Sequence, residues 1–301
     1  MSATPELRLL VVHAHPDDEA ISTGVTLAKY AQAGVGVTLV TCTSGEEGEI
    51  LVPHLAHLAA DKDDALGEHR RKEMQKALAA LGVRDHRYLG GEGKYRDSGM
   101  AGTPSNTRSD SFMQADLLQV AKDLVQIIRE VKPQVVVTYD DFGGYGHPDH
   151  IQAHRGVHYA VDLAAIAGFA PELGEPWRVS KLYWTAIPRS FVQTGIERMI
   201  EAGNSRFFGV TSADELPFVV DDSLVTTCIR APELVPQKMA ALRAHQTQVE
   251  EGGDFFLAFE QMGPEAWGNE FYRLVGGSLF GAAAVGGAPD ELESDLFAGV
   301  K

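Results

Sequence analysis

The sequence predicts a Rossmann-like, doubly wound α/β fold with a mainly parallel sheet and a smaller C-terminal α/β lobe. In the first half of the 301-residue chain, short β-rich segments alternate with longer segments of helical periodicity, which is typical of a parallel sheet flanked by helices. Strand candidates such as "VVVTY" are also apolar without interruption, and this favours strands that helices cover on both faces.

Each predicted element has a local reason in the sequence. Apolar, β-rich runs predict strands at 7–13, 36–44, 86–90 and 134–140, and helical patterns lie between them near 19–33, 64–81 and 115–131. Gly34 and Gly82 stand where the first two helices should end. Beyond residue 165 we expect strands at 181–187 and 224–229 and a helix near 233–250. We therefore predict a Rossmann-like domain at 1–165, on which that helix packs back, and a smaller lobe at 166–301.

Charge and cysteine content exclude several classes of protein. The formal net charge of −16 argues against a nucleic acid partner, because binding to phosphates requires clustered Lys and Arg. The two cysteines, Cys42 and Cys228, lie in apolar runs and indicate buried thiols in a reducing compartment. No signal peptide or membrane span is predicted, so we expect a cytoplasmic protein. A chain of this size needs no structural metal for stability, so a bound metal would serve chemistry.

The segment "HAHPDDEA" at 13–20 places five titratable groups directly after the first predicted strand. In open α/β sheets, ligands bind outside the carboxyl ends of the strands. Pro16 disfavours helical geometry at His15, so the following helix should begin near Asp17 or Asp18. His15 and Asp18 can then point to one side of this corner and share a cation.

A second corner of the same kind, "YGHPDH" at 145–150, follows the predicted strand at 134–140. Pro148 suits the first position of a helix, and His147 and His150 again stand three residues apart. Asp149 is free to accept a hydrogen bond from an imidazole and so to fix its tautomer. The two corners can therefore face each other and bind one ion.

Together the two corners supply the ligands of a catalytic zinc site. Such sites use three protein ligands with nitrogen or oxygen donors and leave one position open for water. His15, Asp18 and His150 meet this requirement, so we expect one Zn²⁺ per chain; the same donors also accept Fe²⁺. A divalent cation lowers the pKa of its water from about 15.7 to about 7, and Asp17 is our candidate general base.

Amide hydrolysis also needs a hydrogen-bond donor to the oxyanion and an acid for the departing amine. His147 and Tyr145 carry suitable protons in the second corner. Other interpretations stay open: Asp17 and Asp18 could cap a helix, or the protein could bind a sugar without turning it over. A nucleotide-binding Rossmann protein is a distant alternative, because "HAHPDDE" stands where a G-x-G-x-x-G motif would be required. Taken singly, the remaining histidines are expected not to be ligands: His13, His54, His57, His69, His86, His154, His158 and His245.

"AHPDDE" followed by "HPDH" resembles the motif pair of the LmbE/PIG-L-type zinc-dependent deacetylase superfamily, which includes N-acetylglucosaminyl-phosphatidylinositol deacetylases. "CTSGEEGE", "YLGG", "RDSGMAG" and "GGYGHPDH" are similar to its mycothiol-biosynthesis branch. The resemblance implies His15, Asp18 and His150 as zinc ligands, Asp17 as the base, and His147 as acid or oxyanion donor. It also implies that Tyr145 polarises the carbonyl and that Asp149 orients a histidine. Sugar and inositol hydroxyls would be bound by charged side chains: Arg70, Asp97 and Glu49.

The implied function is a zinc-dependent hydrolase that removes the N-acetyl group of a glucosaminyl-inositol in mycothiol biosynthesis. Its partner would be this small amino-sugar inositol substrate, with no nucleic acid and no membrane, and a homo-oligomer is left open. Alternatives within the superfamily are a mycothiol S-conjugate amidase or another N-acetyl-sugar deacetylase. "RDSGMAG", and the Gly between Tyr145 and His147, favour the deacetylase. The segment "EGGDFFLAFEQMGPEAWGNEFYRLVGGS" matches no pattern, so the wall of the site on that side is not predicted.

Overall fold

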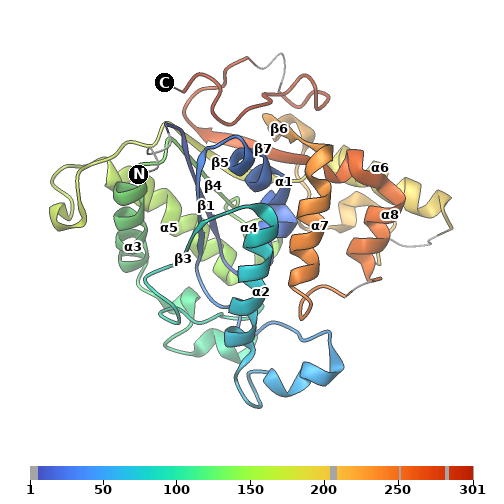
Figure 1. Ribbon diagram of the computed structural model, residues 1–301, viewed down its shortest axis with the longest axis horizontal. Coiled ribbons are helices and arrows are strands. Elements are labelled where there is room, and N and C mark those ends of the chain that lie inside the picture. Colours follow the sequence, from blue (N-terminus) through green and yellow to red (C-terminus); the bar gives the residue numbers. More distant parts are fainter. Residues whose placement is uncertain (1–5, 204–208, 251, 282–284, 301) are drawn as a thin grey trace.

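One seven-stranded sheet forms the centre of the protein (Figure 1). The computed structural model describes residues 6–203, 209–250, 252–281 and 285–300. The strand order across the sheet is β3-β2-β1-β4-β5-β7-β6. The strands span the following residues: β1 Arg8–His13, β2 Gly36–Thr41, β3 Asp85–Tyr88, β4 Val135–Thr138, β5 Lys181–Ala186, β6 Thr227–Arg230 and β7 Asn269–Gly276.

The order of the strands creates a switch point between β1 and β4. β1 pairs in parallel with β2 on one side and with β4 on the other, and β3 and β5 continue the parallel pairing outward. β7 is antiparallel to both of its neighbours, β5 and β6. The chain therefore leaves β1 and β4 toward opposite sides of the sheet, and a crevice for a ligand is expected at their carboxyl ends.

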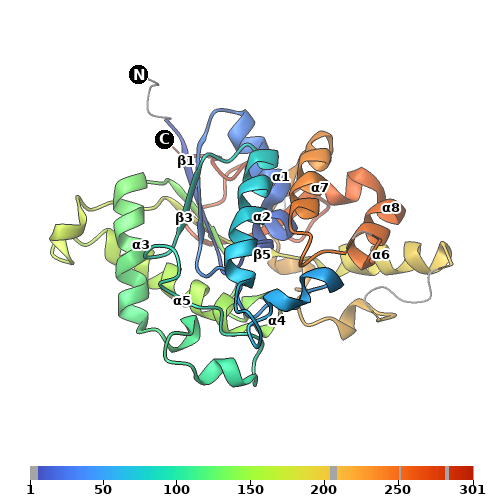
Figure 2. The same cartoon turned by 60° about the horizontal axis from the view of Figure 1, so that its bottom comes forward.

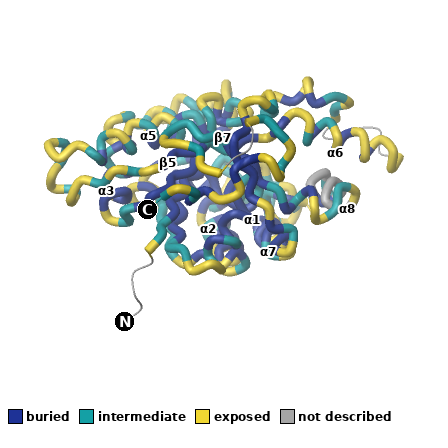
Figure 3. Tube along the Cα trace, turned by 90° about the horizontal axis from the view of Figure 1, so that it is seen from above, coloured by how far each residue is buried: buried dark blue, intermediate teal, exposed yellow. Residues whose placement is uncertain are grey.

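Helices cover both faces of the sheet (Figures 1 and 2). α1 (Asp18–Gln32), α2 (Leu66–Leu81) and α7 (Val235–Ala244) pack on one face, and α3 (Leu117–Val131) and α5 (Pro148–Ala164) pack on the other. Alternate residues of β1 serve the two cores: Leu9 and Val11 face the first group of helices, and Leu10 and Val12 face the second. The central strands β1, β2 and β4 are accordingly buried in the middle of the molecule, whereas β3 at the edge of the sheet is only partly buried (Figure 3).

The remaining helices lie near the β7 end of the sheet or in connections. α6 (Arg189–Glu201) and α8 (Asp254–Trp267) lie beyond β5, and α4 is the short turn Gly143–Gly146 before α5. Among the described residues, no helix has both the length and the apolar character needed to cross a bilayer. Short 3-10 helices occupy several loops: Pro53–Leu58, Pro104–Thr107, Phe112–Gln114, Pro171–Leu173, Ala213–Glu215, Asp222–Leu224 and Pro232–Leu234.

The predicted fold class is confirmed, while some elements differ from the prediction. The helix expected over 233–250 ends at Ala244, where the backbone turns away from helical geometry at His245. α6, α8 and β7 were not predicted; α8 is interrupted at Gly263, whose φ is 75°, and Pro264 follows. The division at residue 165 stays a prediction: α5 ends at Ala164, but strands from both sides of that boundary share one sheet.

Candidate active site

The two predicted corners meet at the switch point of the sheet. His15 lies between the end of β1 and the start of α1, Asp18 begins α1, and His150 lies in the first turn of α5. Three of their atoms form a nearly equilateral triangle. His15 Nδ1 lies 3.3 Å from His150 Nε2 and 3.5 Å from Asp18 Oδ2, and His150 Nε2 lies 3.4 Å from Asp18 Oδ2.

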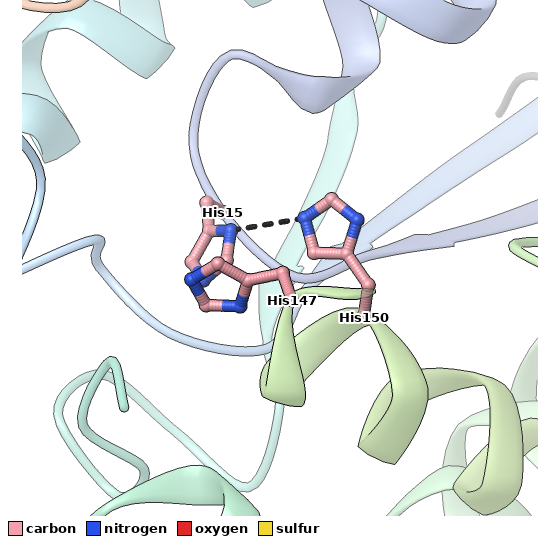
Figure 4. A group of neighbouring side chains, drawn as sticks. All are labelled: His15, His147 and His150. Atoms are coloured by element: carbon pink, nitrogen blue, oxygen red, sulfur yellow. Dashed lines mark hydrogen bonds between the residues drawn. The ribbon is translucent and has the colours of Figure 1, made fainter. Parts of the chain in front are cut away.

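The remote nitrogen of each of these two histidines already has a hydrogen-bond acceptor. His15 Nε2 lies 3.2 Å from Asp149 Oδ2, and His150 Nδ1 lies 3.2 Å from the carbonyl oxygen of Gly143. When these rings are neutral, each carries its proton on the remote nitrogen. His15 Nδ1 and His150 Nε2, which the dashed line in Figure 4 joins, then direct their lone pairs toward each other. Two lone pairs and a carboxylate oxygen pointing at one spot are suited to a cation.

The size of the triangle fits a first-row divalent metal. Zinc binds nitrogen and oxygen donors at about 2.0–2.2 Å, and tetrahedral geometry then separates two donors by roughly 3.3–3.6 Å. All three observed separations, 3.3, 3.4 and 3.5 Å, fall in this range. The predicted ligands are therefore brought together with the spacing that the ion would require.

Two overlapping groups of side chains also have atoms within 4.8 Å of one another: His15 with His147 and His150, and His15 with Asp97 and Asp149. They fit a metal less well. His147 Nδ1 accepts the backbone N–H of Asp149 at 3.1 Å, so a neutral His147 carries its proton on Nε2. Asp97 and Asp149 approach His15 Nε2, the nitrogen that bears the proton when Nδ1 is a ligand.

The carboxylate of Asp18 is held by two further donors. Its Oδ2 accepts the backbone N–H of His15 at 2.9 Å and the hydroxyl of Tyr139 at 2.8 Å. Burial opposes the charged form, but His150 and His15 keep the pKa of Asp18 well below its usual range. Burial also opposes the charged form of His15, but the neighbouring carboxylates raise its pKa well above the usual range: Asp97, Asp149 and Asp18. A metal and a proton therefore compete for the same negatively charged spot.

Asp17 lies beside this triangle in an unusual backbone conformation. Its φ of 115° falls in the region that favours glycine, and its side chain is 16% exposed. Asp17 Oδ2 accepts a hydrogen bond from Arg70 Nη2 at 2.9 Å. Loss of solvation raises the pKa of Asp17 to about 6, although the positive charge of Arg70 opposes this shift. A carboxylate with this environment stays ionised at neutral pH and is a stronger base than a free aspartate.

His147 and Tyr145 stand on the other side of the triangle. Burial, together with the neighbouring His15 and His150, lowers the pKa of His147 to about 3, so the ring is neutral at physiological pH. In Figure 4 the His147 ring lies next to that of His15; their centroids are 4.5 Å apart. Tyr145 is 41% exposed, and its ring packs edge-on against His150. Burial of the hydroxyl raises the pKa of Tyr145, so the phenol keeps its proton.

The three residues predicted to bind hydroxyls have different environments. Asp97 is buried and accepts backbone N–H groups from Gly99 at 2.8 Å and Glu47 at 3.2 Å. Arg70 is buried as well and donates to the carbonyl oxygens of Gly45 and Pro16. Glu49 is exposed, and within the described part of the chain its carboxylate has no hydrogen-bond partner. All three line one cavity, and their contacts with a substrate stay predictions.

A cavity of about 750 Å³ opens over the triangle. This volume lies within the range of small-molecule sites. At one end the wall is polar and includes His15, Asp17, Asp18 and His150. The opposite wall is apolar and comes from α6, α8, β7 and the connection between α6 and β6: Phe191, Val192, Phe218, Met262, Trp267 and Phe271. This apolar wall includes residues of the segment whose pattern predicted no structure.

Several residues that support the site were not predicted from the sequence. Tyr139 donates to Asp18, and Ser98 donates to Asp149 from its backbone N–H at 2.9 Å and from its hydroxyl. Glu19 and His245, both fully buried, lie 2.7 Å apart directly behind Asp17. The sequence signal for Tyr139 is its place at the end of the strand run "VVVTYD", and that for Ser98 is its place in "RDSGMAG", directly after Asp97; nothing adjacent marks His245.

Comparisons with known proteins identify the family. The model of the PIG-L family, GlcNAc-PI de-N-acetylase, matches residues 10–161, which include both corners. The chain is 53% identical over 300 residues to 1D-myo-inositol 2-acetamido-2-deoxy-alpha-D-glucopyranoside deacetylase 1 of Catenulispora acidiphila, covering 99% of this chain and 91% of the relative. It is 54% identical to the deacetylase of the same name from Thermobispora bispora, covering 97% and 98%.

A solved structure shares the fold at low sequence identity. The N,N'-diacetylchitobiose deacetylase from Pyrococcus horikoshii superposes with a TM-score of 0.60 at 20% identity, over 89% of this chain and 83% of that one. This similarity supports the α/β architecture, and the sequence comparisons support the membership that the two motifs predicted. The chain belongs to the PIG-L family, GlcNAc-PI de-N-acetylase.

Proposed function

We propose that this protein is a metal-dependent deacetylase that hydrolyses the N-acetyl group of an N-acetylglucosaminyl-inositol to acetate and a free amine. The observation that carries the proposal is the triangle of His15 Nδ1, Asp18 Oδ2 and His150 Nε2 at the polar end of a cavity. The names of relatives more than 50% identical over nearly the whole chain support the same substrate. The sequence resemblance described above assigns the reaction to mycothiol biosynthesis.

His15, Asp18 and His150 would hold one divalent cation per chain. When bound there, a cation lowers the pKa of water and polarises the acetamide carbonyl. Asp149 holds His15 through Nε2, and Gly143 holds His150 through Nδ1, so both rings are oriented before any ion arrives. We propose zinc as the ion, and the same donor set accepts ferrous iron.

Asp17 would act as the general base. It is adjacent to Asp18 in sequence, lines the cavity, and has one oxygen held by Arg70 at 2.9 Å. Its other oxygen, Oδ1, accepts no hydrogen bond from the residues that the structure describes, and it would take the proton of the attacking water. The attack adds water to the carbonyl carbon of the amide. The proton held by Asp17 then passes to the nitrogen, the C–N bond breaks, and acetate and the free amine leave.

His147 would donate a hydrogen bond from its Nε2–H to the oxyanion, while the departing amine would receive the proton that Asp17 takes from water. Its Nδ1 accepts the backbone N–H of Asp149, which leaves the Nε2 proton to face the cavity. Tyr145, with its protonated phenol at the cavity wall, would add a second donor to the carbonyl oxygen. The oriented donors require no rearrangement when negative charge develops, which is the usual source of oxyanion stabilisation.

The sugar and inositol hydroxyls would meet the rim of the polar end. The carboxylate of Glu49, to which no described residue donates, is the most available acceptor there. Asp97 would offer the lone pairs that its backbone donors leave free. Arg70, whose Nη groups bind Pro16, Gly45 and Asp17, would act on the substrate mainly through the position of Asp17.

A second candidate substrate is the larger amide of a mycothiol S-conjugate, which the amidases of the superfamily cleave. The apolar wall of the 750 Å³ cavity favours it, because an acetyl group alone would leave Phe191, Phe218 and Met262 uncovered. Relative kcat/KM for the acetylated pseudo-disaccharide and for a thiol conjugate separates the two. Faster hydrolysis of the conjugate would contradict the proposed substrate.

Acetate release by the purified protein tests the proposal directly. We expect release from the N-acetylglucosaminyl-inositol, its loss on chelation, and its return when zinc or ferrous iron is added. Asp17→Asn should lower kcat by about 100- to 10,000-fold while the protein keeps one metal ion per chain. Unchanged acetate release by the metal-loaded Asp17→Asn protein would exclude Asp17 as the base.

A further inference from the structure

The backbone of Asp17 is held in a conformation that an aspartate does not adopt freely. Its φ and ψ are 115° and −32°. Such a conformation costs a non-glycine residue of order 1–3 kcal/mol and persists only where the surroundings enforce it. Asp17 makes no side-chain cap to α1, although Ala20 and Ile21 both donate to its carbonyl oxygen at 3.0 Å. Further contacts must therefore enforce the conformation.

A buried pair of side chains holds the backbone N–H of Asp17, on the other side of its Cα. The backbone N–H of Asp17 donates to Glu19 Oε2 at 2.9 Å, and His245 Nε2 lies 2.7 Å from Glu19 Oε1. Both side chains are 0% exposed. One Glu19 oxygen thus fixes Asp17, and the other is fixed by a histidine 226 residues further along the chain.

The turn that carries His245 is itself anchored. It follows α7, which packs against α1 and α2. Thr247 donates to Glu73 of α2 from its backbone N–H at 2.9 Å and from its hydroxyl at 2.7 Å. Gln248 Nε2 donates to the carbonyl oxygen of Glu49 at 3.0 Å. His245 therefore meets Glu19 from a fixed position, and the turn is also tied to the rim of the cavity.

We infer that His245 is a positioning residue, which acts through Glu19 to hold the backbone of Asp17 in its productive conformation. His245 is not part of the cavity wall, so it does not touch the substrate. The side chain of Asp17 is held by Arg70, and its backbone by Glu19 and His245, so the carboxylate is fixed from two sides. The inference rests on the proposed function, in which Asp17 is the base.

Two substitutions at His245 separate positioning from packing. Glutamine places an amide nitrogen near the position of histidine Nε2 and can donate to Glu19, whereas asparagine is too short to do so. We expect His245→Asn to lower kcat by about 10- to 100-fold, since a shift of 1 Å at a reacting group costs about 100-fold. KM should change by less than about threefold, and His245→Gln should recover most of kcat.

Thr247→Val is the matched control for loss of a buried polar contact in the same turn. It removes the hydroxyl bond to Glu73 and one acceptor of Gln248 Nε2. The backbone bond from Thr247 to Glu73, which still anchors the turn, and the His245–Glu19 contact stay in place. We expect a fall in Tm similar to that of His245→Asn, with kcat near that of the wild type. Equal kcat in the asparagine, glutamine and wild-type proteins would overturn the inference, as would an equal loss in Thr247→Val.

A second readout does not depend on activity. Amide hydrogen exchange at Asp17 should be faster in His245→Asn by about tenfold or more and unchanged in Thr247→Val, because the N–H loses its fixed acceptor. If the wild type releases no acetate, the proposed function fails, while this exchange pattern still tests the contact. If neither His245 variant folds, Glu19→Gln decides, because Asp17 and His245 use different oxygens of Glu19 and the amide replaces one of these oxygens with an NH2 group. Unchanged exchange and kcat in that variant would overturn the inference.

Discussion

Removal of one hydroxyl, in Tyr139→Phe, should weaken metal binding without touching a ligand. The Tyr139 hydroxyl donates to Asp18 Oδ2 at 2.8 Å and accepts the backbone N–H of Ala14 at 2.8 Å. Loss of a partner that orients a ligand typically costs 10- to 100-fold in metal affinity. The Ala14 N–H is left buried without an acceptor, which costs roughly 1–3 kcal/mol of the free energy of unfolding.

Tyr30→Phe provides the control, because the Tyr30 hydroxyl makes the same pair of contacts elsewhere. It donates to Asp295 Oδ1 at 2.8 Å and accepts the backbone N–H of Leu296 at 2.7 Å. Metal affinity is measured by competition with a chelator, and stability by denaturant unfolding of the metal-free protein. Both variants should lose similar stability, but only Tyr139→Phe should lose metal affinity. Metal affinity within about threefold of wild type in Tyr139→Phe, or an equal loss in Tyr30→Phe, would refute the reasoning.

Two further predictions concern the packing around the site. Gly45→Ala should lower kcat by about 10-fold or more with metal content unchanged, because a Cβ at Gly45, whose φ is 70°, would collide with the Arg70 guanidinium that holds Asp17. Steady-state kinetics together with metal analysis checks this. A wild-type kcat in the variant would contradict the prediction, because it would show that the guanidinium can move without displacing Asp17. Cys42 and Cys228 should resist alkylation at pH 8 in the native protein and react after unfolding, because both thiols are buried. Burial raises the pKa of Cys228 to about 12 and raises that of Cys42 further. Rapid labelling of the native protein, measured by mass spectrometry, would contradict this prediction.

The parts of the site that the sequence predicts are those in which local order determines position. Each corner combines a strand end, a proline and ligands three residues apart, and α1 and α5 begin at Asp18 and Pro148 as the prolines require. Because both corners follow strands of one parallel sheet, they must open on the same edge. The contact of His15 with His150 therefore follows from short motifs 135 residues apart.

The unpredicted parts depend on contacts between distant segments. His245 meets Glu19 only because α7 packs beside α1, and no local pattern around either residue indicates the other. α8 and β7 lie in a stretch whose periodicity is broken by Gly263 and Pro264, so the apolar wall of the cavity had no sequence signature. The resemblance implied that Arg70 binds hydroxyls, but no local pattern indicated that its guanidinium would be buried against the carbonyl oxygens of Gly45 and Pro16.

The proposed chemistry requires one ion held by His15, Asp18 and His150, and an anomalous difference map from crystals of the zinc-loaded protein tests this directly. We predict one strong peak per chain, about 2.0–2.2 Å from His15 Nδ1, Asp18 Oδ2 and His150 Nε2. A peak bound by His147, or one between Asp97 and Asp149 on the other side of the His15 ring, would contradict the account.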